Sequence, residues 1–427
     1  MSATPAFDVT AARAAFPALS GSYIYADNAG GSQCLGSVAT RLTDYLLKSN
    51  VQLGADYSVS VTSTKRVDEG LEAARQMLNA KSVNEVAFGY SSSLAAENLA
   101  RALEADVLPG EEIIVTGEHE ANSTPWKRLA ERKSLTIKLW HATTSPDTPN
   151  NPYSVGLRIA DLLPLITAKT RLVAFTACSN LLGSVVPVKD VIRAIKAKAN
   201  EVGARKIETS VDCVAYAPHR RIDVQDWDVD YCFFSVYKVY GAHVSILYTR
   251  AENVKASLTR LTHHFLSYDA TSLKLMPGGP GYELVYSTTA VPEYLQSLTP
   301  AGTLEASYGA IARYEQTLIQ PLLTYLKSKE GRGVRIVGDE SAGISRVPTI
   351  SFVVVGPARV SSRDVVKIFD QAGNIGIRYG HFYAWTLIES LEPKIDLADS
   401  IVRISLVHYN TAQEVERIIE LLEHALA

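Results

Sequence analysis

The feature that most constrains the fold of this chain is a regular alternation of short apolar runs and helical patterns between residues 85 and 248. The apolar runs have the pattern of strands, and the segments between them have helical periodicity. We therefore predict an α/β fold in which a mostly parallel sheet carries helices on both faces. The predicted strands are 85–88, 112–116, 136–140, 170–176, 207–212, 228–235 and 244–248, and the predicted helices are 95–103, 123–132, 159–166 and 189–201. Before this alternation, the segments 38–48 and 66–78 also have helical periodicity.

The pattern changes after residue 287, where the alternation gives way to an α+β arrangement. With 427 residues the chain exceeds one ordinary hydrophobic core, so we expect two domains. We place the larger domain at residues 20–290 and build the smaller one from residues 1–19 and 291–427. The expected elements of the C-terminal part are helices 304–328, 362–372 and 412–426 and strands 334–337, 349–355 and 402–407.

The composition describes a soluble, enzyme-sized protein and excludes several classes of partner. A formal net charge of -3 gives no electrostatic reason to expect nucleic acid or an anionic membrane. We find no apolar stretch long enough to span a bilayer and no secretory signal at the N-terminus. The cysteines have no metal-ligand spacing and suit reduced thiols, so we expect a cytoplasmic protein without a metal site. They are Cys34, Cys178, Cys213 and Cys232.

A lysine, Lys238, follows an apolar run directly, in a turn of the form Ser235-x-x-Lys238-x-x-Gly241. Apolar surroundings lower the pKa of an ammonium group and make the amine a nucleophile. Asp212 closes the preceding strand-like run. Pyridoxal phosphate needs this pair, because an amine forms the Schiff base and a carboxylate keeps the pyridine nitrogen protonated. Each residue alone is more often a surface lysine or a helix-capping aspartate, so the assignment depends on the residues around them.

Other polar residues also fall at or just beyond the ends of predicted strands. Ser92 and Ser93 open a helix, where hydroxyl groups and the helix dipole suit a phosphate, although N-capping alone would explain them. His119 could stack on a planar ring, and Asn180 could donate to a ring oxygen; alone, each would be an ordinary loop or turn residue. Ligands of open α/β sheets bind outside the carboxyl ends of the strands, and this shared location favours a cofactor site.

Taken in order, these motifs resemble those of the class V aminotransferase and cysteine desulfurase family, which are pyridoxal-phosphate enzymes of fold type I. The resemblance extends from the turn at 25–31 to the segment at 402–410. It implies a large domain with a mostly parallel sheet of the seven-stranded type between helices, and a smaller α+β domain at the C-terminus. It also implies pyridoxal 5'-phosphate as cofactor, an amino acid as substrate and a homodimer.

The resemblance further implies roles for single residues. Lys238 would bind the cofactor covalently, Asp212 would contact the pyridine nitrogen, and His119 would lie over the ring. Arg378 and Arg403 would bind the substrate carboxylate, with Asn28 also on the substrate side. The cofactor-binding set is Ser92, Ser93, His119, Asn180, Asp212, Ser235, Tyr237 and Lys238, with Gly279 in the segment 277–281 approaching from the second subunit.

Departures from the family pattern carry the functional information. Desulfurases of the group II type place a sulfur-accepting cysteine in a Gly-His-His-Cys context, whereas this chain has Gly-His-Phe-Tyr at 380–383. A phenol cannot carry a persulfide, so a desulfurase would have to use Cys34 or Cys178. A glutamine of the family is replaced in 212–215, and Tyr237 replaces a histidine. With the polar loop at 143–153, these changes make the chain similar to fungal desulfurase-like lyases and a decarboxylative aldolase.

We therefore expect α,β-elimination of the sulfur group from a cysteine S-conjugate or cysteine sulfoxide, giving pyruvate and ammonia. Lys238 would remove the Cα proton, and Tyr383 or His381 would protonate the departing sulfur. An equally good interpretation makes that pair an aromatic patch with Phe382 and Trp385. The alternatives are a decarboxylative aldolase acting on an aspartate-like substrate, an aminotransferase and a cysteine desulfurase.

Overall fold

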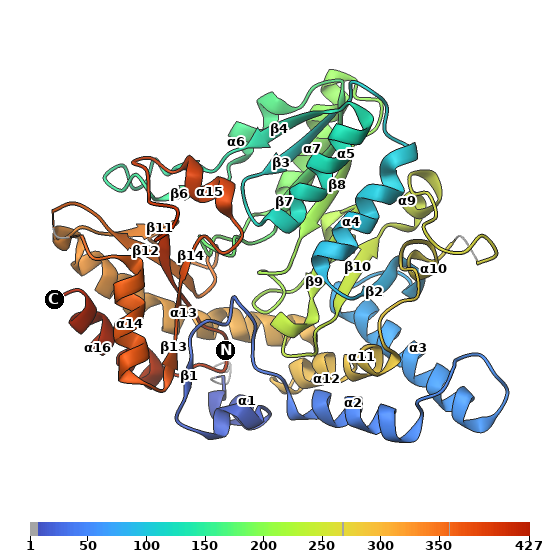
Figure 1. Ribbon diagram of the computed structural model, residues 1–427, viewed down its shortest axis with the longest axis horizontal. Coiled ribbons are helices and arrows are strands. Elements are labelled where there is room, and N and C mark those ends of the chain that lie inside the picture. The colour runs from blue at the N-terminus through green and yellow to red at the C-terminus, as the bar shows by residue number, and fades with distance from the viewer. Residues whose placement is uncertain (1–6, 267–268, 358) are drawn as a thin grey trace.

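A seven-stranded sheet forms the centre of the larger part of the protein in a computed structural model that describes residues 7–266, 269–357 and 359–427 (Figure 1). Every pair of neighbouring strands is parallel except the two pairs made by β10, which runs antiparallel to both neighbours. This arrangement confirms the predicted α/β fold. The strand order is β2 (Val86–Gly89), β10 (Ser245–Thr249), β9 (Tyr231–Ser235), β8 (Glu208–Asp212), β7 (Thr170–Thr176), β3 (Glu112–Thr116) and β4 (Thr136–Trp140).

Helices cover both faces of this sheet because its strands are apolar on both sides. In β7, Leu172 and Ala174 pack into one core, whereas Val173 and Phe175 pack into the other. The first core is closed by α4 (Ser92–Ala102), α5 (Thr124–Lys133) and α10 (Thr271–Leu275). The second is closed by α3 (Ser58–Leu78), α7 (Val188–Val202), α12 (Ala290–Ser297) and the start of α13 (Leu304–Ser328), with contributions from α2 (Gly36–Lys48) and α11 (Tyr282–Ser287).

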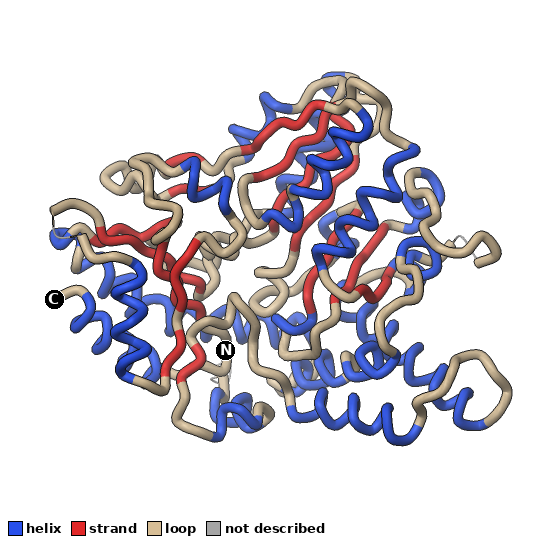
Figure 2. Tube along the Cα trace, viewed as in Figure 1, coloured by secondary structure: helices blue, strands red, loops and turns tan. Residues whose placement is uncertain are grey.

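A second, four-stranded antiparallel sheet lies in the C-terminal part, as Figure 2 shows by its separate group of red strands. The C-terminal half of α13 packs against it, so this long helix belongs to the cores of both parts. The strand order is β11 (Val334–Val337), β12 (Thr349–Val354), β15 (Ile401–Ser405) and β14 (Arg378–Gly380), and the helices are α14 (Ser362–Ala372), α15 (Trp385–Ser390) and α16 (Ala412–Ala425).

The N-terminal segment connects with the C-terminal part. After α1 (Val9–Ala14), strand β1 (Ile24–Tyr25) pairs in parallel with β13 (Ile375–Gly376), and Ala26 lies in the core of the C-terminal part. The predicted large domain includes β1, but its only strand partner among the described residues is β13. The domain boundaries at 20 and 290 stay a prediction.

Most predicted elements have their expected places, and the differences have local causes. The helix predicted at 66–78 begins earlier in the structure, at Ser58. The prediction began too late because the first turns are rich in serine, threonine and valine and have little helical periodicity. The helix predicted at 159–166 narrows after α6 (Ile159–Leu162) to a 3-10 turn, where Pro164 lacks the N–H that the helix needs. The polar loop at 143–153 contributes β5 (Thr143–Thr144), which pairs with β6 (Val155–Gly156).

The remaining short helices lie in connections between the larger elements and were not predicted. Two of them flank the strand pair β9 and β10, where the chain turns between strands. They are α8 (Val224–Trp227) and α9 (Ala251–Ala256). Within the described residues, we find no helix whose length and apolar content would let it cross a bilayer.

Candidate active site

The predicted cofactor residues of the large sheet lie around one cavity at the carboxyl ends of adjacent strands. Strands β3, β7, β8 and β9 are neighbours in the sheet, and their ends carry His119, Asn180, Asp212 and Lys238. The parallel register explains why residues far apart in sequence meet here. The cavity is lined by Ser91, Ser92, Ser93, His119, Ala121, Thr176, Cys178, Asn180, Asp212, Val214, Ala215, Ser235, Tyr237 and Lys238.

Lys238 ends a single 3-10 turn after β9, which points its side chain into the cavity. Its side chain is 7% exposed, and its Nζ donates a hydrogen bond to the carbonyl oxygen of Ala29 at 2.7 Å. Burial lowers the pKa of Lys238 to about 8, and the nearby Arg403 acts in the same direction, while Asp212 opposes it. About one amine in ten is therefore neutral and nucleophilic at pH 7.

Asp212 closes β8 and lines the same cavity. Its Oδ1 accepts a hydrogen bond from the backbone N–H of Val214 at 2.8 Å. Burial raises the pKa of Asp212 to about 6, against the opposing effects of this hydrogen bond and of the Lys238 charge. The carboxyl group is thus ionised above that pH, and it suits the protonated nitrogen of a pyridine ring.

The start of α4 offers a place for a phosphate group. Ser91 is the N-cap and accepts a hydrogen bond from the N–H of Leu94 at 3.2 Å. N-capping therefore explains Ser91 but not the two serines that follow it. The hydroxyl groups of Ser92 and Ser235 lie 2.7 Å apart, and both line the cavity with Ser93. A helix N-terminus with free backbone N–H groups and adjacent hydroxyl groups binds anions well.

His119 follows β3 and caps a short 3-10 turn at 120–122, where its Nδ1 accepts a hydrogen bond from the N–H of Ala121 at 3.2 Å. Burial lowers the pKa of His119 to about 4, with a further contribution from the Lys238 charge. The ring is therefore neutral at physiological pH. A neutral, flat imidazole at the side of the cavity suits stacking on an aromatic cofactor.

Asn180 lines the cavity but has a partner that was not predicted. Its Nδ2 donates a hydrogen bond to the carbonyl oxygen of Phe382 at 3.0 Å, and its Oδ1 is buried without a partner among the described residues. A buried polar atom without a partner is uncommon in native proteins and marks a place where a ligand can bind. With the amine, the acid and the hydroxyl groups, this orphaned atom shows that the residues of the cavity fit pyridoxal phosphate.

Two arginines lie side by side because β14 and β15 pair with Arg378 opposite Arg403. Arg403 reaches the edge of the cavity, where its Nη1 donates a hydrogen bond to the carbonyl oxygen of Asn180 at 3.1 Å. Arg403 is 2% exposed, and its Nη2 lies 2.8 Å from Oδ1 of Asp27. The Arg378 side chain is 56% exposed, and its Nη1 lies 3.5 Å from the other oxygen of the same carboxylate. The guanidinium carbons lie 3.7 Å (Arg403) and 5.3 Å (Arg378) from the ring centre of Phe382. Sequence reasoning proposed both arginines and named Phe382 only as part of an aromatic patch, and it did not single out Asp27.

Glu118 is a second residue that the sequence did not single out. It is buried just before His119, and its Oε2 accepts a hydrogen bond from the hydroxyl group of Ser179 at 2.7 Å. Burial raises the pKa of Glu118 to about 7, and the Asp212 charge acts in the same direction. The only sequence signal was its place directly after a buried strand.

Asn28 and Gly279 do not line the cofactor cavity, and neither do Arg378, Arg403, Tyr383 and His381. The side chain of Asn28 donates hydrogen bonds to the carbonyl oxygens of Tyr25 at 2.7 Å and Ser405 at 3.0 Å, and it accepts one from Tyr409, so it holds the turn at 25–31 together. Gly279 lies in the connection between α10 and α11 with a φ of 61°, and its predicted role requires a second subunit. Both roles stay predictions.

The two candidates for a proton donor lie in different places. The ring of Tyr383 lies 5.4 Å from the ring of His119, and 68% of Tyr383 is exposed. His381 does not line the cofactor cavity; its ring packs against Trp385 at 5.2 Å, and its Nδ1 accepts the N–H of Tyr383 at 3.2 Å. The geometry therefore favours Tyr383, and it shows that part of the predicted aromatic patch exists as well.

Among the cysteines, Cys178 lines the cofactor cavity and Cys34 does not. Cys178 is buried, and burial raises the pKa of its thiol well above the ordinary range. A buried neutral thiol is a poor nucleophile. Of the four cysteines, all of which are described, Cys178 is the one that lines this cavity, and its buried thiol is ill suited to accept sulfur.

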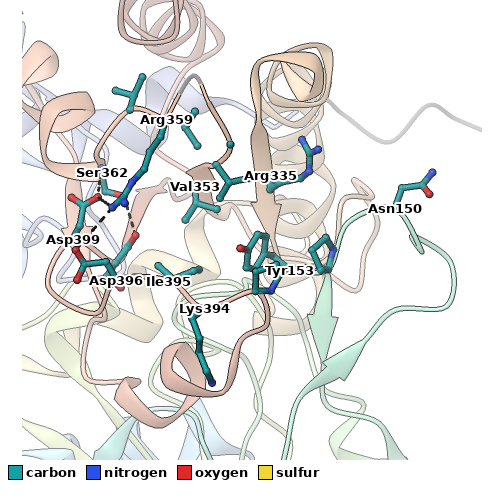
Figure 3. A pocket seen from close by; sticks show the side chains of 17 residues that line it. Asn150, Tyr153, Arg335, Val353, Arg359, Ser362, Lys394, Ile395, Asp396 and Asp399 are labelled. Carbon is teal, nitrogen blue, oxygen red and sulfur yellow. Dashed lines mark hydrogen bonds and ion pairs between the residues drawn. The ribbon is translucent and has the colours of Figure 1, made fainter.

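A second cavity, of about 490 Å³, lies in the C-terminal part near the start of α14 (Figure 3). Tyr153, Val353 and Ile395 form part of its wall, and Arg359 is paired there with Asp399 at 3.6 Å. None of the predicted site residues lines it. In the described part of the chain, no group of three or more His, Cys, Asp and Glu side chains is placed to hold a metal ion.

Comparison with known proteins agrees with this geometry. The profile of the family described as Aminotransferase class-V matches residues 24–418. Aminotransferase-like protein FGM3 of Gibberella zeae is 40% identical over 426 residues, which cover 98% of this chain and 99% of that protein. Cysteine desulfurase-like protein ustD of Aspergillus flavus is 32% identical over 415 residues, covering 96% of this chain and 88% of that protein.

Solved structures share the fold over nearly the whole length. A cysteine desulfurase from Thermococcus onnurineus has a TM-score of 0.81 at 22% identity, with 99% of each chain covered. The cysteine desulfurase CsdA from Escherichia coli has a TM-score of 0.78 at 23% identity, again with 99% of each chain covered. The family match and the fold together confirm the resemblance that the motifs indicated. The chain belongs to the class-V aminotransferase family, which includes the cysteine desulfurases, and its cofactor is pyridoxal phosphate.

Proposed function

We propose that the protein is a carbon–sulfur lyase that acts on a cysteine S-conjugate or a cysteine sulfoxide. The observation that carries the proposal is the residue pair at the cavity mouth. Tyr383 occupies the position of the sulfur-accepting cysteine of the desulfurases and lies 5.4 Å from the ring of His119. A phenol cannot accept sulfur, but it can protonate a leaving group. The site therefore retains the groups for breaking a bond at Cβ and lacks the group for keeping the sulfur.

In this proposal each residue has a stated task. Lys238 would hold the cofactor, and its amine would take the proton from Cα of the substrate. Asp212 holds the proton of the pyridine nitrogen, and Arg403 binds the α-carboxylate of the substrate. Bound pyridoxal phosphate supplies the electron sink that stabilises negative charge at Cα. The balanced reaction of an S-alkyl cysteine adds one water and releases a thiol, pyruvate and ammonia.

One observation favours a second candidate, a decarboxylative aldolase. Two guanidinium groups lie at the substrate side, and a single Asp27 carboxylate neutralises only one of their charges. Arg378 is thus available for a second acidic group on the substrate, as in aspartate. Such a substrate would lose its β-carboxylate as carbon dioxide, and the resulting carbon nucleophile would attack an aldehyde. An aminotransferase or a desulfurase would use the same cofactor residues.

A substrate panel separates these candidates. The holoenzyme is incubated with S-ethyl-L-cysteine, its sulfoxide, L-cysteine, and L-aspartate with an aldehyde, while pyruvate, thiol, sulfide and carbon dioxide are measured. The lyase predicts pyruvate and thiol in equal amounts from the S-ethyl substrate and none from the Lys238→Ala variant. Carbon dioxide from aspartate in the absence of pyruvate from either sulfur substrate would replace the lyase with the aldolase.

We also propose that the enzyme is a homodimer in which the segment at 277–281 approaches the site of the second subunit. The resemblance to the family supports this arrangement, and Gly279 lies outside the cavity of its own chain. Sedimentation velocity of the holoenzyme tests it: a single species of monomer mass across micromolar concentrations would contradict the proposal.

A further inference from the structure

We propose that Glu120 is a positioning residue that fastens the segment 381–387 of the C-terminal part to the large sheet, so that Tyr383 stays over His119. We call this segment the clasp. The clasp runs from the connection after β14 into the first turn of α15, and its contacts cross to the loop that follows β3. The role of Tyr383 in protonating a leaving group rests on the proposed lyase function. The attachment of the clasp by Glu120 does not depend on that function.

Backbone hydrogen bonds join the clasp to the opposite side of the cavity. The carbonyl oxygen of Tyr383 accepts the N–H of Glu120 at 2.9 Å, and the N–H of Leu387 donates to the carbonyl oxygen of Gly117 at 2.9 Å. A Cβ atom at Gly117 would lie 3.2 Å from the methyl group of Thr386, so the two segments are in close contact. Figure 1 shows α15, which begins within the clasp, on the side of the C-terminal part toward the seven-stranded sheet.

The side chain of Glu120 adds the contacts that the backbone cannot supply. Its Oε1 accepts a hydrogen bond from the hydroxyl group of Thr386 at 3.2 Å. Its Oε2 accepts one from Thr124 at 2.8 Å and pairs with Lys127 at 3.5 Å. The carboxylate thus connects the first turn of α5 with the clasp, and Thr386 is its only partner on the clasp among the described residues.

The clasp needs such fastening because its backbone is strained. Phe382 and Tyr383 have φ values of 49° and 62°, in the left-handed region that residues with a Cβ avoid. Strained conformations persist only where surrounding contacts hold them, and they gather at functional sites. Asn180 holds Phe382 in this conformation by donating a hydrogen bond to its carbonyl oxygen at 3.0 Å.

The fastened Tyr383 forms one wall of an outer cavity of about 690 Å³ that continues the cofactor cavity toward the surface. Both cavities are lined by Ser91, Ser93, His119, Ala121 and Tyr237. A substrate whose α-carbon lies at Lys238 extends its Cβ substituent into this space. When the C–S bond breaks with its electron pair on sulfur, the sulfur takes the phenolic proton of Tyr383, and water returns a proton to the phenolate.

The first experiment tests the fastening without substrate. Hydrogen exchange of peptides covering 381–390 is measured in the holoenzymes of the wild type, Glu120→Ala, Glu120→Gln and Thr386→Val. We expect exchange at least about tenfold faster in Glu120→Ala and Thr386→Val, and near wild type in Glu120→Gln, which retains an acceptor for Thr386. Lys127→Met is the matched control, because it removes only the ion pair. Unchanged exchange in Glu120→Ala would overturn the proposal.

The second experiment tests the consequence by changing the leaving group. Chloride leaves β-chloroalanine without a proton, whereas the thiolate of S-ethyl-L-cysteine needs one. In Glu120→Ala we expect kcat for the S-ethyl substrate to fall at least about tenfold, as for loss of a general acid, while kcat for β-chloroalanine changes less than about twofold. An equal loss for both substrates would overturn the positioning role. A wild type that converts neither substrate would reject the lyase function and leave the exchange result to decide the fastening.

Discussion

Cofactor uptake by the cofactor-free protein should report the pKa of one side chain, Lys238. Only the neutral amine attacks an aldehyde, so the rate of uptake follows the fraction of Lys238 that is deprotonated. Burial lowers the pKa of this amine to about 8 from its ordinary value of 10.5, a difference of about 3.4 kcal/mol in the free energy of deprotonation. At pH 7 about one amine in ten is then neutral, compared with about one in three thousand for an ordinary lysine, a ratio of about 300.

The assay mixes cofactor-free protein with pyridoxal and follows the rise of the visible absorbance band between pH 6 and 10.5. Because deprotonation makes the nucleophile, the rate should rise about tenfold per pH unit below the midpoint and level off above pH 8. Nα-acetyl-lysine amide is the solution control, and its rate should go on rising to above pH 10. Lys238→Ala should show no band at all.

Two variants test the sign of the electrostatic contribution. Arg403 lowers the pKa of Lys238 and Asp27 raises it. Arg403→Met should therefore move the midpoint to higher pH, and Asp27→Asn should move it to lower pH. A wild-type midpoint above pH 10, or a shift of both variants in the same direction, would refute the reasoning about burial and charge at this site.

Three further predictions follow from the geometry. The double variant Ser92→Ala, Ser235→Ala should bind pyridoxal phosphate more weakly, because it loses hydrogen bonds to the charged phosphate. We expect the Kd, measured by equilibrium dialysis, to rise about 10- to 100-fold per lost hydrogen bond. An unchanged Kd would place the phosphate elsewhere. Tyr383→Cys should let the holoenzyme form a persulfide from L-cysteine, detected by mass spectrometry after alkylation, while the wild type forms none. Gly183→Ala should lower the Tm far more than Gly203→Ala: both glycines have a φ near 70°, but only at Gly183 would the new Cβ lie 2.2 Å from a carbonyl oxygen.

The sequence sufficed for the parts of the fold that depend on local pattern. Buried parallel strands are mostly apolar runs, so the bounds of β3 and β7 could be predicted from the local sequence pattern. The partly exposed edge strand β4 was predicted from its place in the same alternation of strands and helices. The cofactor residues could be placed for the same reason. Each follows the end of such a run, and parallel strands bring their carboxyl ends to one edge of the sheet. His119, Asp212 and Lys238 therefore meet as the order of motifs indicated.

The substrate side could not be placed in this way because its contacts are long-range. Asp27 and Arg403 lie 376 residues apart in sequence, and no periodicity connects them. The resemblance assigned Asn28 to the substrate side, but its amide group holds the turn at 25–31 through Tyr25 and Ser405. Glu120 and Thr386 lie 266 positions apart, so the sequence does not predict the contacts of the clasp for the same reason. Such contacts can be recognised only once the relative positions of the two sheets are known.

The clasp and the arginine pair share one residue, and this limits how the site can change. The carbonyl oxygen of Phe382 accepts the amide of Asn180, while its ring lies 3.7 Å from the guanidinium of Arg403. The carbonyl oxygen of its neighbour Tyr383 accepts the backbone N–H of Glu120, and the Glu120 carboxylate holds Thr386 of the same segment. A substitution that moves the clasp must therefore also move the surroundings of the carboxylate-binding arginine. Effects of Phe382→Ala and Glu120→Ala on kcat and KM should accordingly be non-additive, because the two changes release the same strained backbone. Additive effects would show that the carboxylate site and the proton donor are independent.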